Sequence, residues 1–159
     1  MKILYLFLMF STSSVIGIYY GYLMSERERT LIELSHFLKY LLIQIASQTG
    51  TLAECVSSYK ATKQIKPFIE ELLLKLECGC PGPFESSAKN LYALSSEDIS
   101  FVKSINIGNL DKKGQIRVLE NAITYLDEEI KLSSKDEKKR NTISYSGILA
   151  GLALVIIFI

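Results

Sequence analysis

Apolar residues gather at the two ends of the chain. The first apolar stretch is ILYLFLMFSTSSVIGIYYGYLM, residues 3–24, and the second is ISYSGILAGLALVIIFI, residues 143–159. Every Asp and Glu lies between them. A helix that spans a membrane needs roughly 20 apolar residues, with a range of about 17 to 25. The pattern therefore predicts transmembrane helices over residues 1–24 and 143–159.

Each apolar stretch has one other interpretation. The first could be a secretory signal peptide, but its apolar run is longer than such a peptide needs and no A-x-A cleavage site follows it. The segment SERER, residues 25–29, follows instead and is typical of an uncleaved anchor. The second could be a buried core helix, but a small domain rarely ends on so many uninterrupted aliphatic residues. Two membrane spans are the better prediction.

Between the spans, the apolar residues recur at helical spacing and no stretch alternates like a strand. The first stripe predicts a helix with one buried seam, ending near Gly50: Leu31, Leu34, Leu38, Leu41, Ile45. Thr51 and Glu54 match a capping box and predict a short second helix. Pro67 suits the first turn of a third helix.

The segment CGCPGP, residues 78–83, forces a loop, because its glycines and prolines do not continue a helix. A fourth helix is predicted over about Phe84 to Ala93. Ser95 and Asp98 make a second capping pattern, which predicts a short fifth helix.

The last helix of the middle region should be the longest. After Asp111, a good N-cap residue, a second apolar seam follows with the spacing of the first: Ile116, Leu119, Ile123, Leu126, Ile130. No Pro or Gly interrupts residues 115–146, so we expect this helix to run directly into the second span. We likewise expect the first span to run directly into the first helix of the middle region. Two matched seams predict an all-α fold: a small antiparallel helical bundle over residues 25–142, between two transmembrane helices.

Basic residues next to the spans predict the orientation. Arg27 and Arg29 follow the first span, and Lys138, Lys139 and Arg140 precede the second. The positive-inside rule therefore places the bundle in the cytoplasm and both termini outside. The formal net charge of +1 does not favour a nucleic-acid partner.

The sequence contains no constellation for catalysis or for a cofactor. The three cysteines, two of them in CGC, could join the single His36 as four zinc ligands by count, but their spacing matches no closed zinc site. His36 falls on the polar face of its helix, and the run at residues 127–129 is typical of a solvated face. We therefore predict a protein that is not an enzyme and holds no cofactor or metal.

Small residues recur four apart in both predicted spans. Gly17 and Gly21, with Ser13 one turn earlier, lie in the first span, and Gly147 and Gly151 lie in the second. Small residues at this spacing let membrane helices approach closely, so these five predict the packing surface between the spans. The alternative is that glycine is simply common in membrane helices.

The whole chain resembles the stage III sporulation protein AB family of endospore-forming bacteria. The resemblance rests on the order of anchor, helical domain and anchor, and on four segments: SERERTLIELSHFLKYLLIQI, TGTLAEC, IGNLDKKGQIRVLENAITYLDEEI and KDEKKRNTISYSGILAGLALVIIFI. The family more usually has Leu-Gly-x-Ser-Asp where this chain has Ile107 to Asp111, and a Pro where Gly50 or Thr51 stands.

The resemblance implies a structural role in sporulation. The family is similar to the inner-membrane platform protein of type II secretion and belongs to the channel complex between mother cell and forespore during engulfment. It implies a stage III sporulation AA-type ATPase and other stage III channel proteins as partners, and a place in the outer forespore membrane with the bundle in the mother-cell cytoplasm. Whether copies of the chain associate with one another stays open.

The ATPase implied by the resemblance should contact the part of the bundle farthest from the membrane. The expected helix lengths put residues 48–51 and 108–115 there, with Asp111, Lys112, Lys113 and Gln115 as candidate docking residues. Asp111 could instead serve only as a helix cap, and the face carrying Val118 and Tyr125 is the alternative docking surface.

Two other classes of protein share some of these features. A holin-like pore former would also pair glycine-rich spans, but it seldom carries so large a folded domain. A membrane-anchored scaffold or sensor would share the bundle and the anchors, but it should act in vegetative cells. Expression confined to the sporulating mother cell would favour the channel interpretation over both.

Overall fold

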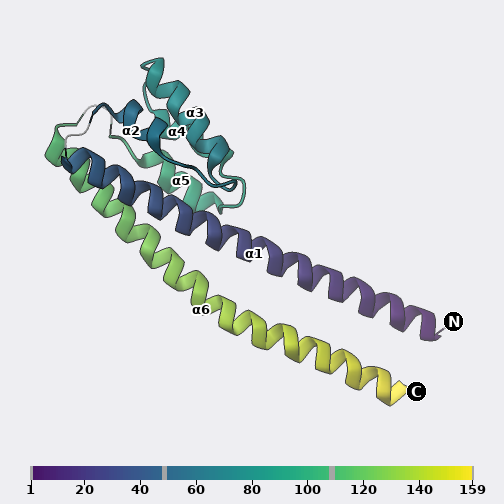
Figure 1. The fold of residues 1–159 in the computed structure, drawn as a ribbon. Helices are drawn as coiled ribbons and strands as arrows, with labels where there is room; N and C mark the ends of the chain where they lie inside the picture. Colours follow the sequence, from purple (N-terminus) through teal and green to yellow (C-terminus); the bar gives the residue numbers. More distant parts are fainter. Residues whose placement is uncertain (1, 48–49, 108–109, 159) are drawn as a thin grey trace. The chain divides into compact units, whose positions relative to one another are not determined.

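The chain is all-α in the computed structural model, which confirms the predicted class. The structure describes the backbone of residues 2–47, 50–107 and 110–158, and the side chains of residues 15, 19, 21–47, 50–107 and 110–135. Six α-helices and one 3₁₀ turn, η1, make up the described part (Figure 1): α1 Lys2–Ser47, α2 Leu52–Ser58, α3 Lys66–Glu77, α4 Pro83–Ser87, η1 Ala88–Asn90, α5 Ser96–Ser104 and α6 Lys112–Phe158.

The structure divides into two compact units. One is Glu26–Ile130, and the other comprises Met1–Ser25 and Lys131–Ile159. We call Glu26–Ile130 the bundle. The helical domain predicted from the sequence covered residues 25–142. The helices α1 and α6 contribute residues to both units, with 46 and 47 residues respectively. Each predicted span is therefore continuous with the neighbouring helix of the bundle, as expected from the sequence.

Among the residues whose side chains are described, no helix has a stretch long and apolar enough to cross a membrane. The second predicted span, residues 143–159, lies wholly outside those residues. Of the first span, residues 1–24, only 15, 19 and 21–24 are among them. The two spans stay a prediction.

The bundle is built on antiparallel segments of α1 and α6. Ser35 of α1 bonds to Asp127 of α6, and Ala46 near the end of α1 is joined to Lys112 at the start of α6. Six residues of the two predicted seams are almost fully buried in the core, and Phe37 and Ala122 are buried beside them: Leu31, Leu34, Leu38, Leu41, Leu119 and Leu126. The four isoleucines of the seams are only half-buried: Ile45, Ile116, Ile123 and Ile130. Full burial of one such leucine stabilises the fold by about 1.5–3 kcal/mol.

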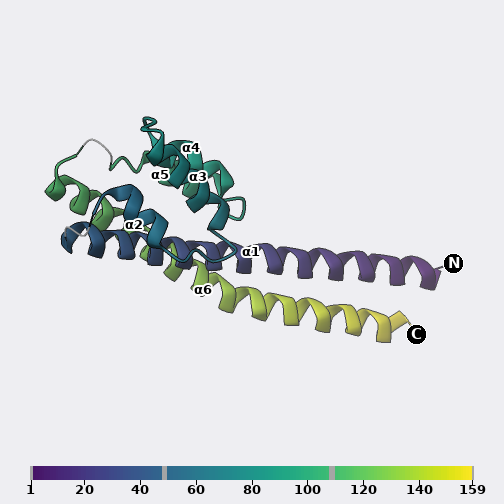
Figure 2. The same cartoon turned by 45° about the horizontal axis from the view of Figure 1, so that its top comes forward.

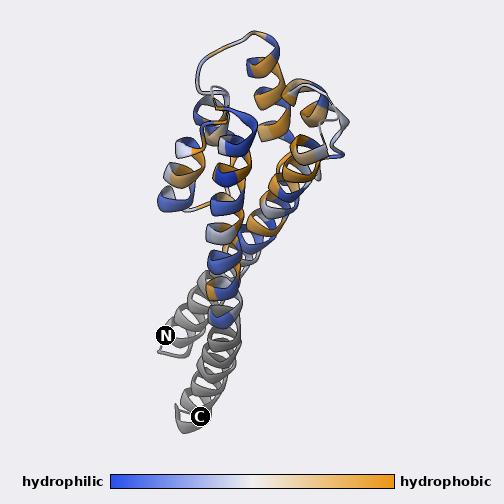
Figure 3. Ribbon diagram, turned by 90° about the vertical axis from the view of Figure 1, so that its left-hand side faces the viewer, coloured by the Kyte–Doolittle hydropathy of each residue, from blue (hydrophilic) through white to orange (hydrophobic). Residues whose placement is uncertain are grey.

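The short helices pack over one side of these two segments (Figures 1 and 2). Aromatic rings connect them to α1. The ring of Phe37 in α1 lies edge-on to Phe68 in α3, with centroids 6.2 Å apart, and Phe68 in turn contacts Phe84 in α4 at 6.1 Å. Such pairs contribute about 0.5–1.5 kcal/mol beyond burial of their area. Figure 3 shows hydrophobic and hydrophilic residues interspersed along each short helix, as burial of one side requires.

The helix starts predicted from capping patterns are confirmed. Thr51 and Glu54 form a reciprocal capping box on α2, and Ser95 and Asp98 form one on α5. Pro67 lies in the first turn of α3, where its missing N–H costs nothing. These starts were visible in the sequence because a cap joins residues only three positions apart.

The predicted fourth helix over Phe84 to Ala93 is wrong in length. The α-helix α4 ends at Ser87, and the chain tightens into η1 before Leu91 turns into the core. The buried hydroxyl of Ser87 donates to the carbonyl oxygen of Pro83 at 2.7 Å. Serine hydroxyls that bond to backbone groups in this way weaken a helix, and burial of Leu91 gains more than another helical turn would.

Candidate functional site

The end of α1 and the start of α6 lie side by side, as the sequence predicted. The Lys112 ammonium donates a 2.8 Å hydrogen bond to the carbonyl oxygen of Ala46. The last carbonyls of a helix lack partners within the helix, so a lysine there satisfies one of them and suits the negative end of the helix dipole. We call residues 46–47, 50–51 and 110–115 the loop end of the bundle. Lys112 is therefore half-buried and structural.

Two other predicted docking residues also serve the local fold of the loop end. Asp111 caps α6, because its Oδ1 accepts a hydrogen bond from the backbone N–H of Gly114 at 3.1 Å. The amide of Gln115 donates to the carbonyl oxygen of Leu110 at 3.1 Å. The capping role weighed for Asp111 in the sequence is thus its observed role, although its side chain is also exposed.

Lys113 differs from its neighbours because its side chain is exposed, as is that of Arg117 one turn later. The first turn of α6 contains no acidic residue. The start of a helix carries a partial positive charge. A cation there destabilises the helix by about 0.3–1 kcal/mol, whereas an anion there stabilises it. The start of α6 therefore combines the exposed positive charges of Lys113 and Arg117 with the negative charge of the capping Asp111. Lys113 and Arg117 are the exposed basic pair that a partner could contact near this end.

A polar cluster that the sequence did not reveal joins α1, α5 and α6. The guanidinium of Arg27 donates to both carboxylate oxygens of Asp98, at 2.8 and 3.0 Å, and to Glu129 at 2.8 Å. Asp98 is almost completely buried, while Arg27 and Glu129 are mostly covered. The sequence indicates Asp98 only as a capping residue, because no local signal marks a partner 71 positions away.

Burial by itself would raise the pKa of the Asp98 carboxyl. The hydrogen bonds from Arg27 and from the Ser95 side chain and backbone outweigh it, so the pKa of Asp98 lies below its ordinary value. The same hydrogen bond from Arg27 to Asp98 raises the pKa of the guanidinium, against the opposing effect of burial. Both groups stay charged at neutral pH. We call Arg27, Asp98 and Glu129 the polar cluster.

The carboxylate run at residues 127–129 is not the solvated face that was predicted. Asp127 accepts hydrogen bonds from the Ser35 hydroxyl at 2.8 Å and from the Lys39 ammonium at 3.0 Å. Glu129 belongs to the polar cluster, and Glu128 alone is exposed. Adjacent positions of a helix point in different directions, so two of the three carboxylates reach α1 and the third reaches solvent.

The two residues of the alternative docking face are half-buried. The ring of Tyr125 stacks on Phe101 of α5, with centroids 3.7 Å apart and planes 20° from parallel. Val118 is half-buried against the core. The side chains of Lys113 and Arg117 are more exposed than these two.

The predicted packing glycines are not tested by the structure. The surroundings of Ser13, Gly17, Gly147 and Gly151 lie outside the described residues. At Gly21, no atom lies within 4 Å of the position that a Cβ would take. The packing surface between the spans stays a prediction.

Within the described part of the chain, no three His, Cys, Asp or Glu side chains lie together in a way that could hold a metal ion. His36 is exposed, as its helical position indicated. The described residues form a helical bundle with two long helices, and the exposed basic pair Lys113 and Arg117 lies in and next to its loop end. The fold defines an all-α class of protein, in which a small helical bundle is built on two long helices.

The model of the family described as stage III sporulation protein AB matches residues 2–159. The chain belongs to this family, as the sequence predicted, and therefore has a role in sporulation. No curated protein and no solved structure matches the chain.

Proposed function

We propose that this protein is a non-enzymatic membrane platform subunit of the channel complex between mother cell and forespore. Its bundle faces the mother-cell cytoplasm, both of its ends anchor it in the outer forespore membrane, and it docks the stage III sporulation AA-type ATPase. Family membership supports the role in sporulation, and the apolar ends of the sequence support the anchors. Other stage III channel proteins are its membrane partners.

One observation carries the proposal of two anchors on one side of the bundle. Arg27 and Glu129 are hydrogen-bonded at 2.8 Å, and they lie next to the residues at which α1 and α6 leave the bundle. The two helices therefore leave it at the same end. Two apolar segments that continue from one end are suited to enter the same membrane from the same side, whereas exits at opposite ends would favour a bridge between two membranes.

The native cysteines offer a direct test of the cytoplasmic placement. Cys78 is exposed and Cys55 is buried, so a variant with Cys80→Ser presents one accessible thiol. We expect that thiol to resist a membrane-impermeant maleimide in intact cells and to react once the cells are opened. A matched variant with Cys78→Ser, Cys80→Ser and Lys2→Cys should react without opening of the cells when they are sampled before engulfment closes the space between the two membranes. Labelling of Cys78 from outside would overturn the placement.

The proposed docking surface is the exposed basic pair Lys113 and Arg117. Charge reversal of both should reduce co-purification of the ATPase at least tenfold and block spore maturation. An acidic residue at position 113 suits the positive start of α6, worth about 0.3–1 kcal/mol, so we expect no loss of stability to explain the effect. Lys112 is left unchanged because it holds the end of α1.

The matched control is charge reversal of Lys60 and Lys63, which are exposed between α2 and α3 and change the net charge equally. This control should bind the ATPase normally. Normal binding by the Lys113→Glu, Arg117→Glu variant would exclude this basic pair as the docking surface. Equal loss in both variants would show a response to net charge and not to a specific surface.

A further inference from the structure

Two cysteines are fixed in one tight turn at the end of α3. Cys78 closes the helix, Gly79 has a φ of 64°, and Cys80 follows. The backbone N–H of Gly79 bonds to the carbonyl of Leu76 at 3.2 Å, and that of Cys80 bonds to the carbonyl of Lys75 at 3.0 Å. This pair of bonds is the Schellman motif, in which glycine takes the left-handed position at no steric cost. The helix end therefore holds both cysteines in a defined relation.

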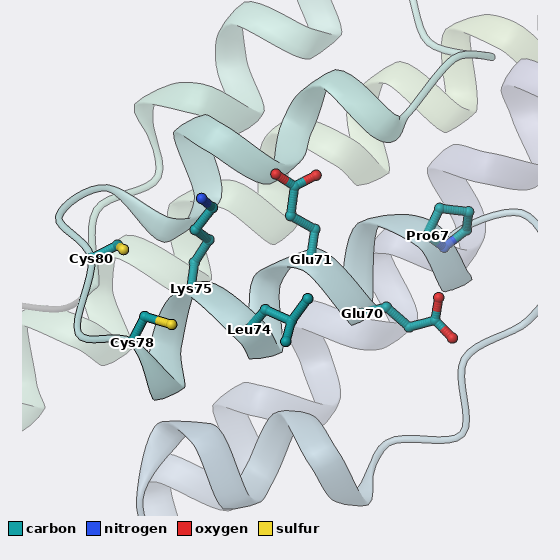
Figure 4. A pocket seen from close by; sticks show the side chains of 7 residues that line it. All are labelled: Pro67, Glu70, Glu71, Leu74, Lys75, Cys78 and Cys80. Carbon is teal, nitrogen blue, oxygen red and sulfur yellow. The ribbon is translucent and has the colours of Figure 1, made fainter.

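Both thiols line the same hollow on the surface of the bundle. Its other lining residues belong to α3, and Figure 4 shows both cysteine side chains pointing toward that helix: Pro67, Glu70, Glu71, Leu74 and Lys75. Cys78 is exposed and Cys80 is half-buried beside it.

The third cysteine lies in the core and not at the surface. Cys55 is buried in the core, 4% exposed, and burial raises the pKa of its thiol, with a further contribution from Glu54. A buried thiol with a raised pKa is a poor nucleophile and is closed to reagents. The chain thus contains an accessible pair and an inert single cysteine, which serves as an internal control.

We infer that Cys78 and Cys80 form a dithiol that exchanges with low-molecular-weight disulfides. The Cys78 thiolate attacks one sulfur of a disulfide R–S–S–R, which forms Cys78–S–S–R and releases R–S⁻. The Cys80 thiolate then attacks the Cys78 sulfur, which forms the Cys78–Cys80 disulfide and releases the second R–S⁻. The two protein thiols lose two electrons and two protons, and two molecules of R–SH carry them away. A thiol beside the modified one is the arrangement in which such resolution occurs.

Metal binding is a weaker explanation of the same pair. Zinc needs four ligands, and no third His, Cys, Asp or Glu in the described part of the chain joins the two thiols. The difference in exposure also suits sequential roles, because the exposed Cys78 meets the reagent and the half-buried Cys80 resolves the product.

The test uses the full chain in detergent, incubated with glutathione disulfide and analysed by mass spectrometry. The native chain should lose two hydrogen atoms in mass, and a proteolytic fragment should contain Cys78 linked to Cys80. The Cys80→Ser variant should instead gain one glutathionyl group on Cys78, and Cys78→Ser should react at least tenfold more slowly. Cys55→Ser should behave like the native chain.

Three results would overturn the inference. The native chain could accumulate a stable glutathionyl adduct, which would mean that Cys80 does not resolve it. It could form disulfide-linked dimers, which would pair cysteines of different chains. It could also react only after denaturation, together with Cys55, which would mean that the folded turn is closed to disulfides.

Discussion

At the scale of single residues, Arg27 makes the most consequential contacts of the bundle. It binds one almost completely buried carboxylate, Asp98, and one partly covered carboxylate, Glu129. Placing charges in the interior costs several kcal/mol per ion unless each is paired and hydrogen-bonded, by the usual estimates. Asp98 is both paired with Arg27 and hydrogen-bonded to the backbone, because its carboxylate also accepts a hydrogen bond from the N–H of Ser95 at 3.1 Å. The pair is therefore costly to break from either side.

We predict that Asp98→Asn lowers the free energy of unfolding by about 3 kcal/mol, because it leaves the Arg27 guanidinium covered without its main counter-charge. Thermal unfolding of the full chain, followed by near-ultraviolet circular dichroism, measures the effect. The neighbouring exposed carboxylate offers the control: Glu97→Gln should change stability by less than about 0.5 kcal/mol. Equal stability of the two variants would contradict a stabilising role for the polar cluster.

The depressed pKa of Asp98 sets the direction of a pH dependence. Its stabilising effect is fully present above the unfolded pKa of about 3.9 and is lost as the pH falls through the lower pKa of the folded state. We therefore expect the difference in stability between the native chain and Asp98→Asn to be constant near neutral pH and to shrink below about pH 4. A difference that grew on acidification would contradict this assignment.

At the scale of elements, the start of α6 departs from ordinary helix preferences. It carries two lysines and Gly114 in its first turn, and glycine is about 1 kcal/mol less favourable than alanine within a helix. The structure gives a reason for the glycine. A Cβ at position 114 would lie 2.8 Å from Oδ1 of Asp111 and 3.2 Å from the Cβ of Leu110. The capping carboxylate occupies the space that a side chain would need.

The cap and the glycine should therefore be coupled. In the native chain, Gly114→Ala should leave stability nearly unchanged, because the gain in helix preference and the loss of the Asp111 cap are each about 1 kcal/mol. In an Asp111→Ala background, the same change should stabilise the chain by about 1 kcal/mol. Thermal unfolding of the four chains gives the coupling energy, and additive effects would show that Asp111 and Gly114 are independent.

At the scale of the whole molecule, the open question is how the two predicted spans associate. If they pack through the small residues named above, Gly147→Ile or Gly151→Ile should reduce disulfide crosslinking between cysteines placed in the two spans. The bundle lies in a separate compact unit, so its unfolding temperature should not change. Ala153→Ile is the matched control, because residue 153 lies on the side of the helix away from Gly147 and Gly151 and the substitution adds the same kind of bulk there. Unchanged crosslinking in all three variants would mean that the glycines have no role in contact.

Most of the helices could be predicted from the sequence because their determinants are local. A seam with residues three and four apart and a cap with residues three apart depend only on the geometry of one helix. The seams of α1 and α6, the two capping boxes and the turn after α3 were found in this way. The length of α4 could not be found in this way, because the burial of Leu91 depends on the core that it enters.

The same distinction between local and long-range determinants applies to the candidate site. The sequence indicated that the loop end joins α1 to α6 and that Asp111 is a cap, since both follow from helix lengths and a local motif. Only the tertiary structure decided that Lys112 binds Ala46 and that Arg27 binds Glu129, across 66 and 102 positions. Such pairs form only when the register of two helices brings the side chains within hydrogen-bond distance. That register is set by packing across the whole core, which no single segment of sequence contains.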